Sequence, residues 1–166
     1  MIFVTIGSMF PFDRLIRAMD AWAEAQGPAH GSGRDGPEIL AQIGRGGYEP
    51  KHMRWVRLLG RDDYTSVVTQ ADLVVAHAGM GSVITAGEHG KPIVVLPRRA
   101  AQGEHTNDHQ VDTAGWLRTR PGVYVADAEQ ELAARVAEAL AGKAGRTVEA
   151  CAPAAFLARI RAFAQG

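Results

Sequence analysis

Short, almost uninterrupted runs of aliphatic and β-branched residues recur along this chain, separated by segments of helical period. The clearest runs cover residues 2–6, 73–76 and 93–96, and weaker ones cover 38–43, 54–58 and 123–126. A strand that is apolar on both faces must be covered on both faces, as in a parallel sheet flanked by helices. The sequence therefore predicts an α/β fold, a Rossmann-like domain with a mostly parallel sheet and helices on both faces.

Two helices have recognisable starts. Asp13 is placed to cap a helix that carries apolar residues at helical spacing and ends at Gly27-Pro28. A second helix is expected after Asp127, with Gln130 as a capping-box-like partner three residues on. These starts place helices after the first and the last predicted strand.

Other segments carry weaker signals. Residues 27–36 are rich in glycine and predict a surface loop, and apolar residues between 156 and 164 predict a last helix. That helix is either a docking surface for a partner or packs back onto its own sheet. Trp22 and Trp116 fit the apolar faces of helices, which predicts that both lie in the core.

Length and charge narrow the class of protein. The chain has 166 residues and no long linker, so residues 1–166 are expected to form a single domain. Its 18 Lys and Arg balance its 18 Asp and Glu, and this absence of net charge argues against nucleic acid as a partner. No apolar run reaches the roughly 18 residues of a membrane span, and the first residues suggest a strand rather than a signal peptide. A single cysteine, Cys151, permits no internal disulfide and fits a reducing cytoplasm.

Two turns after predicted strands carry glycine and serine. The first strand leads into Gly7-Ser8, and the strand at 73–76 leads into His77-Ala78-Gly79-Met80-Gly81-Ser82 and then a helix. A helix N-terminus presents free N–H groups and partial positive charge, which suits a phosphate or diphosphate. A plain tight turn is the competing interpretation, since the third glycine of a dinucleotide-binding motif and the lysine of a P-loop are missing.

A polar run follows the strand at 93–96. It begins at Arg98-Arg99 and continues from Gln102 to Gln110. Such a run at the carboxyl edge of a sheet either binds sugar hydroxyl groups or forms a solvated loop. His105 and His109 have the spacing of a zinc-binding helical pair, but no cysteine or nearby third ligand supports a metal site. A hydrolytic triad of His77, Ser82 and Asp108 is disfavoured, because Ser82 does not lie in a nucleophile-elbow motif.

Four separated motifs occur together in one order: FVTIGS at 3–8 with Phe12-Asp13, ADLVVAHAGMGS at 71–82, GKP at 90–92 and NDHQ at 107–110. Over residues 1–115 the chain resembles the C-terminal, donor-binding domain of glycosyltransferase family 28. It is most similar to split members that consist of the donor half alone, which act in bacterial capsule and exopolysaccharide assembly and in eukaryotic dolichol-linked GlcNAc transfer. The segment 103–110 is more similar to the bacterial group, often assigned to glucuronosyl or galactosyl transfer.

The resemblance implies one Rossmann-like half of a GT-B enzyme and inverting transfer from a UDP-sugar without a metal or other cofactor. Gly7 and Ser8 would line the diphosphate from one side and residues 79–82 from the other. Segment 60–62, with Arg61, would meet the uracil, and the sugar would be bound from the polar run. The residues implied to bind substrate are Gly7, Ser8, Arg61, Gly79, Met80, Gly81, Ser82, Thr85, Glu88, Arg98, Glu104, Asn107, His109 and Gln110.

Two points of this site stay open. Many relatives carry an acidic residue for the ribose where this chain has Thr85, so either Glu88, one turn on, takes that task or ribose is held differently. Arg98 or Arg99 either pairs with a donor carboxylate, which would favour UDP-glucuronate, or belongs to a solvated loop.

Loss of UDP from the anomeric carbon leaves negative charge that the helix start, aided by His77 or an arginine, would stabilise. Inverting transfer also needs a general base. In two-domain relatives the other half supplies it, so we expect a membrane-associated partner subunit that carries the base and binds a lipid-linked glycan. The chain itself is expected in the cytoplasm, at the inner face of the membrane. A UDP-GlcNAc transferase subunit and a non-catalytic nucleotide-sugar-binding module are the alternatives.

Overall fold

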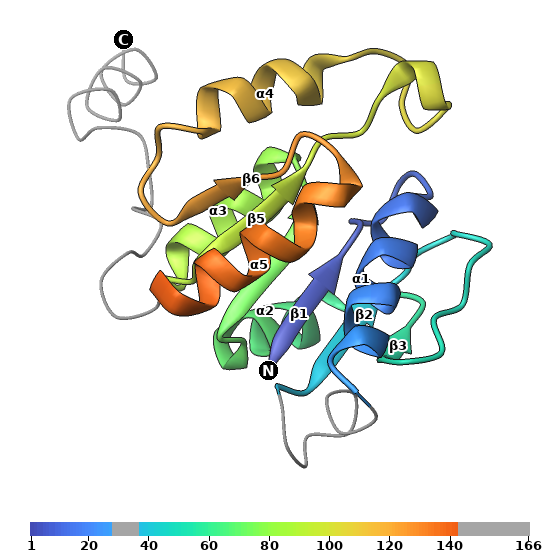
Figure 1. Cartoon of the computed structure of the whole chain (residues 1–166), viewed down its shortest axis with the longest axis vertical. Coiled ribbons are helices and arrows are strands. Elements are labelled where there is room, and N and C mark those ends of the chain that lie inside the picture. Colours follow the sequence, from blue (N-terminus) through green and yellow to red (C-terminus); the bar gives the residue numbers. More distant parts are fainter. Residues whose placement is uncertain (28–36, 143–166) are drawn as a thin grey trace, which may run out of the picture.

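A computed structural model describes residues 1–27 and 37–142. Its centre is a six-stranded, fully parallel sheet of order β3-β2-β1-β4-β5-β6 (Figure 1). The strands are β1 (Ile2–Thr5), β2 (Ile39–Gln42), β3 (Arg54–Val56), β4 (Leu73–His77), β5 (Ile93–Leu96) and β6 (Val123–Val125). Each lies within a segment predicted as a strand, apart from one added residue at the end of β4. The predicted α/β fold is confirmed.

Helices cover both faces of the sheet. They are α1 (Asp13–Ala25), α2 (Arg61–Gln70), α3 (Met80–Glu88), α4 (His109–Leu117) and α5 (Leu132–Ala141), with short 3₁₀ turns at Ala100–Gln102 and Glu129–Glu131. Helices α1 and α5 pack on one face and α2, α3 and α4 on the other, as the composition of the two core clusters shows. Both faces of each central strand are therefore withdrawn from water.

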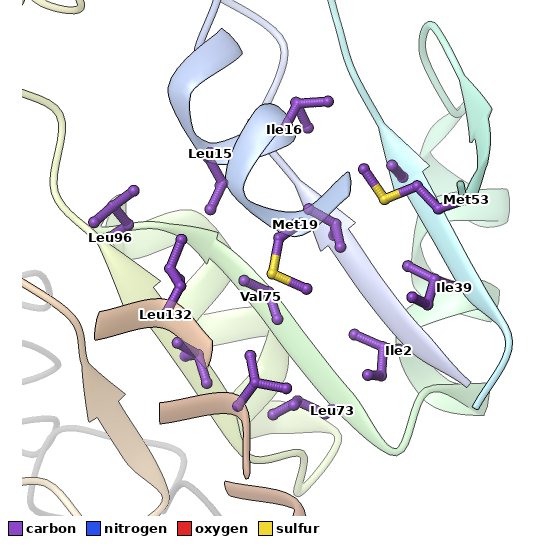
Figure 2. Packing of buried hydrophobic residues seen from close by; sticks show 14 of the residues in the cluster. Ile2, Leu15, Ile16, Met19, Ile39, Met53, Leu73, Val75, Leu96 and Leu132 are labelled. Carbon is purple, nitrogen blue, oxygen red and sulfur yellow. The ribbon is translucent and has the colours of Figure 1, made fainter. Parts of the chain in front are cut away.

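The strands divide their side chains between two cores. Ile2 and Val4 of β1 point into the core under α1 and α5, whereas Phe3 points into the core on the opposite face. Figure 2 shows the first core, where Met19 of α1 packs above the sheet near Val75 of β4. Alternation along a strand that is apolar throughout produces this division.

The strand order determines where a ligand crevice forms in this sheet. From β1 the chain runs to β2 and β3 on one side, then crosses back to β4, β5 and β6 on the other. In open parallel sheets, the loops on either side of such a reversal separate at the carboxyl ends of the strands and leave a crevice. Here the crevice lies beyond β1 and β4, which are the two strands that lead into the glycine turns.

Both predicted helix caps are wrong in detail. Phe12 is the N-cap residue of α1, and Asp13 instead accepts hydrogen bonds from the N–H groups of Gly47 and Tyr48, because a neighbouring loop lies within its reach. Before α5, the N–H of Asp127 donates to Glu131 and not to Gln130. A 3₁₀ turn at Glu129–Glu131 precedes α5, and the acceptor of the Asp127 N–H therefore lies four residues later instead of three.

The two tryptophans differ. Trp22 is partly buried against the core under α1, as predicted. Trp116 is 54% exposed on α4, where Arg120 covers its ring at 4.1 Å, so the prediction of a core position is wrong for it. Helix α4 buries Ala114 and Leu117, which leaves the position of Trp116 on the outer face. The predicted loop at 27–36, apart from Gly27, lies outside the described residues, as do Cys151 and the predicted last helix.

Candidate functional site

A cavity of about 790 Å³ opens at the carboxyl ends of β1, β4 and β5. Its walls come from the β1–α1 loop, the β4–α3 turn, the start of α2 and the loop between β5 and α4. Among the predicted site residues, Gly7, Ser8, Arg61, His77, Gly79, Gly81, Ser82, Thr85, Glu88, Arg98, His109 and Gln110 line this cavity. Met80, Glu104 and Asn107 are not among the lining residues. Lining residues as far apart in sequence as Ile6 and Gln110 thus meet at one edge of the sheet.

The β1–α1 loop is held by side chains from strands on either side of β1. Gly7 has φ +72°, a backbone conformation that favours glycine. Its carbonyl accepts from Nε2 of Gln42 at 3.2 Å, and the carbonyl of Ile6 accepts from Nη2 of Arg98 at 2.7 Å. A trans peptide directs its N–H opposite to its carbonyl, so the Ser8 N–H points away from Gln42. Among the described residues this N–H has no hydrogen-bond partner, and it is available to a ligand.

The β4–α3 turn places a helix start against the same cavity. Gly79 is the N-cap residue of α3 in an extended conformation, and the first turn of the helix contains Gly81 and Ser82. A Cβ atom at Gly81 would have no protein atom within 4 Å, so packing within the described residues does not require glycine there. A ligand can therefore approach the backbone closely at this position. The free N–H groups of the helix start supply partial positive charge.

His77 lies between the two glycine turns. A Cβ atom would lie 3.0 Å from its ring at Gly7 and 2.2 Å from its Nε2 at Gly79, so the ring occupies the space that larger residues would need. Burial, and secondly the positive charge of Arg98, lower the pKa of His77 to about 4. Its Nδ1 is buried without a hydrogen bond of good geometry, although the Thr5 backbone nearby slightly favours the protonated ring. At neutral pH His77 is an uncharged imidazole that offers a hydrogen bond rather than a positive charge.

The loop after β5 and the start of α4 contribute two imidazole rings and a buried amide. His105 stacks edge-on against Phe10 at 5.0 Å and against His109 at 4.4 Å between ring centroids. Gln110 is 3% exposed, and its Oε1 accepts from the Arg98 N–H. Asn107 accepts from the backbone N–H of His109 at the start of α4 and also contacts its ring. Asn107 therefore orients His109 from outside the cavity.

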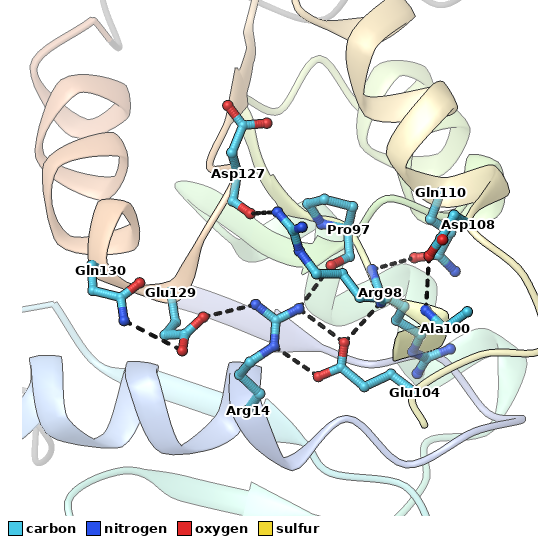
Figure 3. Close-up of polar contacts among 11 residues, drawn as sticks. Arg14, Pro97, Arg98, Ala100, Glu104, Asp108, Gln110, Asp127, Glu129 and Gln130 are labelled. Atoms are coloured by element: carbon cyan, nitrogen blue, oxygen red, sulfur yellow. Dashed lines mark hydrogen bonds and ion pairs between the residues drawn. The ribbon is translucent and has the colours of Figure 1, made fainter. Parts of the chain in front are cut away.

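Glu104 faces away from the cavity into an ion-pair network (Figure 3). Its carboxylate accepts from Nε and Nη2 of Arg14 and from the backbone N–H of Arg99. Arg14 also binds Glu129 and the carbonyl of Pro97. Burial alone would lower the pKa of Arg14, but its bonds to the two glutamates raise it. The network fastens the β5–α4 loop to the first turn of α1.

The two arginines after β5 are not solvated loop residues. Arg98 is 3% exposed, and its guanidinium donates to the carbonyls of Ile6 and Phe10. Arg99 donates to the carbonyl of Asp127 and does not line the cavity. Both side chains are bound to backbone of this chain, so the alternative of a solvated loop is wrong.

The opposite end of the cavity is formed by α2 and the outer part of α3. Arg61 lines it, whereas its neighbours Gly60 and Asp62 do not. Thr85 and Glu88 lie one turn apart on α3 and both line the cavity. The Thr85 hydroxyl donates to the Gly81 carbonyl, whereas Glu88 is exposed.

Sequence reasoning missed several lining residues, of which Gln42 is the most informative. Gln42 is 3% exposed and joins the Gly7 carbonyl to the Leu59 N–H, so it links both ends of the cavity floor. A lone amide at the end of the apolar strand β2 was the available signal. The other missed residues are Ile6, Met9, Phe10, Leu58, Leu59, Tyr64, Thr65, His89 and His105.

Metal ligands do not gather at this site. Within residues 1–27 and 37–142, no group of three or more histidine, cysteine or carboxylate side chains is placed to hold a metal ion. His105 precedes α4 and His109 begins it, so the two do not share a helix face.

The family model for the C-terminal domain of glycosyltransferase family 28 matches residues 1–146. The chain belongs to this family. The family 28 domain is 32% identical over 125 residues to the UDP-N-acetylglucosamine transferase subunit ALG13 of Mus musculus, covering 69% of this chain and 10% of that protein. It is 42% identical over 59 residues to the UDP-N-acetylglucosamine--N-acetylmuramyl-(pentapeptide) pyrophosphoryl-undecaprenol N-acetylglucosamine transferase of Nitratidesulfovibrio vulgaris strain DP4, covering 36% of this chain and 15% of that protein. The family 28 domain thus spans 10 to 15% of the length of these relatives.

Solved structures show the same fold. The Acinetobacter baumannii MurG structure superposes with a TM-score of 0.56 at 18% identity, covering 85% of this chain and 41% of that one. The calicheamicin glycosyltransferase CalG4 superposes with a TM-score of 0.56 at 19% identity, covering 84% and 33%. The family 28 domain therefore has the fold of the C-terminal half of GT-B transferases. In its described part, no helix is both long and apolar enough to cross a membrane.

Proposed function

We propose that this domain is the donor-binding catalytic subunit of an inverting, metal-independent glycosyltransferase that uses a UDP-sugar. The observation that carries the proposal is the meeting of the two glycine turns, Gly7-Ser8 and 79–82, on one cavity at the start of α3. One turn offers the free N–H of Ser8, and the other offers the free N–H groups of a helix start. Their convergence on one point suits a diphosphate.

The chemical step requires stabilisation of the departing UDP. Cleavage of the bond between the anomeric carbon and the diphosphate places new negative charge on the phosphate oxygens while the sugar gains oxocarbenium character. The backbone N–H groups of residues 80–82 and a neutral His77 would donate hydrogen bonds to those oxygens, whereas the Gly79 N–H already donates to the His77 carbonyl. Removal of one donor from a comparable oxyanion site raises the barrier by about 3 kcal/mol.

For the donor sugar, UDP-GlcNAc is the first candidate. Arg99 donates to the Asp127 carbonyl and lies outside the cavity, so it is not placed to pair with a donor carboxylate. The two relatives named above are N-acetylglucosamine transferases. Their names favour GlcNAc over glucuronate or galactose.

Binding of the remaining donor groups follows from which polar atoms are free. Glu88 is exposed in the cavity wall and would take the ribose hydroxyls, because the Thr85 hydroxyl is already bonded within α3. Arg61, at the start of α2, would meet the uracil with the backbone beside it. His109 would contact the sugar hydroxyls, with Gln110 behind it.

We further propose that a membrane-associated subunit supplies the general base and binds a lipid-linked glycan at the inner face of the membrane. ALG13 is itself named a transferase subunit, which supports a divided enzyme. This domain would then work in the cytoplasm.

Calorimetric titration tests donor binding. UDP is expected to bind with the same Kd with and without EDTA, and UDP-GlcNAc more tightly than UDP-glucuronate or UDP-galactose. Gly81→Val should abolish UDP binding without unfolding the domain, because its side chain would fill space that no protein atom occupies. Ile84→Val, on the exposed face of the same helix, is the matched control and should bind UDP as the parent does.

Two outcomes would contradict the proposal. If UDP does not bind, or binds Gly81→Val as tightly as the parent, the glycine turns are not a diphosphate site. If donors bind but the complex with the membrane subunit transfers no sugar, the domain is a nucleotide-sugar-binding module instead.

A further inference from the structure

The guanidinium of Arg98 is a buried cation without an ion-pair partner. No carboxylate of the described chain lies within ion-pair distance of it. Glu104 is close enough to favour the charged form, but its oxygens are already bonded to Arg14 and to the Arg99 N–H. A buried charge is unfavourable unless it is paired and hydrogen-bonded. The two carbonyls that Arg98 binds satisfy part of its hydrogen-bonding capacity and none of its charge.

Burial lowers the pKa of Arg98 to about 10, so the side chain stays protonated at neutral pH. Its Nε–H is buried and has no acceptor among the described residues. The rings of Phe10 and Phe12 lie 6.0 and 5.1 Å from its central carbon, and they exclude water from it. The cation is therefore held in surroundings that screen its field weakly.

This field reaches the cavity. Arg98 is one of the lining residues, and its charge contributes to the lowered pKa of two other lining residues, His77 and His105. Its Nη2 also fixes the carbonyls of Ile6 and Phe10, which bracket Gly7-Ser8. A single side chain thus holds the β1–α1 loop in place and adds a positive charge to the cavity wall.

We propose that Arg98 is the positioning residue of the donor site, and that the diphosphate of the ligand supplies its missing counter-charge. The inference rests on the proposed function, since it takes the cavity as the UDP site. A ligand should then gain from Arg98 in proportion to its phosphate charge. Uridine should gain least, UMP more and UDP most.

A matched pair of variants separates charge from architecture. Arg98→Lys and Arg98→Met both remove the Nη2 group that donates to two carbonyls, but only Arg98→Lys keeps the positive charge. For Arg98→Met we expect affinity losses of about thirtyfold for UDP and about fivefold for UMP, with less than twofold for uridine. For Arg98→Lys the losses should be nearly equal across the three ligands. Arg118→Met removes a surface cation outside the cavity and should leave all three affinities unchanged.

Each result has one meaning. Equal losses for all three ligands in both variants would show that Arg98 is structural only and would overturn the inference. Unchanged affinities would overturn it as well. Failure of the parent protein to bind UDP would instead overturn the proposed function. Circular dichroism and melting of each variant, at the titration temperature, keep loss of fold from imitating loss of affinity.

Discussion

At the level of single residues, the ring of His77 restricts which residue types fit at positions 7 and 79, in the two glycine turns. The ring lies between Gly7 and Gly79, where it would overlap a Cβ atom at Gly79 and contact one tightly at Gly7. The requirement for glycine therefore comes from a neighbouring side chain as much as from φ. Sequence alone identified both glycines, but it did not identify the ring that makes them necessary.

Gly79→Ala is expected to destabilise the domain by about 1 to 3 kcal/mol, because the new methyl group would overlap the His77 ring. Urea denaturation measures this loss. The double variant His77→Ala/Gly79→Ala should recover most of it, since the ring that clashes is gone. If the single and double variants are equally unstable, the clash is not the cause.

His77 also makes stability depend on pH. Its pKa is lowered from 6.5 to about 4 in the folded chain, so the unfolded chain binds a proton first as pH falls. The contribution of His77 to stability is complete above pH 6.5 and is lost progressively down to pH 4, by roughly 3 kcal/mol. His77→Gln should flatten this part of the curve of unfolding free energy against pH. An unchanged slope in the variant would place the titrating group elsewhere.

At the scale of elements, two arginines join the halves of the sheet across its carboxyl edge. Arg98 ties the end of β5 to the β1–α1 loop, and Arg14 ties the start of α1 to the β5–α4 loop through Glu104. These contacts join segments about 90 residues apart in the chain, so no local sequence pattern predicts them. The sequence placed Glu104 among substrate ligands because the polar run looked continuous, whereas the folded loop turns it inward.

Glu104→Gln should lower stability by about 2 kcal/mol, because Arg14 and Glu104 are only 13% and 11% exposed and the change leaves a half-buried arginine poorly paired. Thermal melting measures this. Asp127→Asn breaks the exposed pair with Arg118 and should change stability by less than about 1 kcal/mol. UDP affinity of Glu104→Gln, measured where it is folded, should fall by no more than a few-fold. A large loss of UDP affinity with an unchanged melting temperature would show that Glu104 takes part in ligand binding.

At the scale of the whole molecule, the domain is one half of the architecture seen in its structural relatives. It covers 41% of the MurG chain and 33% of the CalG4 chain. Its cavity opens at the carboxyl edge of the sheet, and the acceptor would approach from that side. Donor binding and sugar transfer are therefore expected to be separable properties.

We expect the isolated domain to bind UDP without transferring sugar, and transfer to appear on addition of the acceptor-binding subunit. Transfer of radiolabelled GlcNAc from UDP-GlcNAc to lipid extract, with and without the coexpressed subunit, measures this. Gly81→Val in place of the parent domain is the control and should give only the blank rate. Full activity of the domain alone would remove the need for a partner.

The layer structure of this protein could be predicted from its amino-acid pattern. Continuous apolar strands alternating with amphipathic helices admit few folds besides a parallel sheet covered on both faces, and each strand was found within about two residues of its predicted ends. Glycine and serine after β1 and β4 identified the two turns, because chain direction in a parallel sheet brings such turns to one edge. The family motifs indicated the ligand class, a UDP-sugar, that these two turns suit.

Which polar side chains face the cavity, and which fasten the loops around it, became visible in the folded chain. Gln42 and Arg98 are buried and bonded to the β1–α1 loop, Glu104 turns to Arg14, and Asn107 supports His109 from outside. Their partners lie far along the chain, and a side chain's orientation depends on which carbonyl or charge the fold brings within about 3 Å. Local sequence fixes the backbone's direction, whereas such long-range pairings exist only once the sheet has formed.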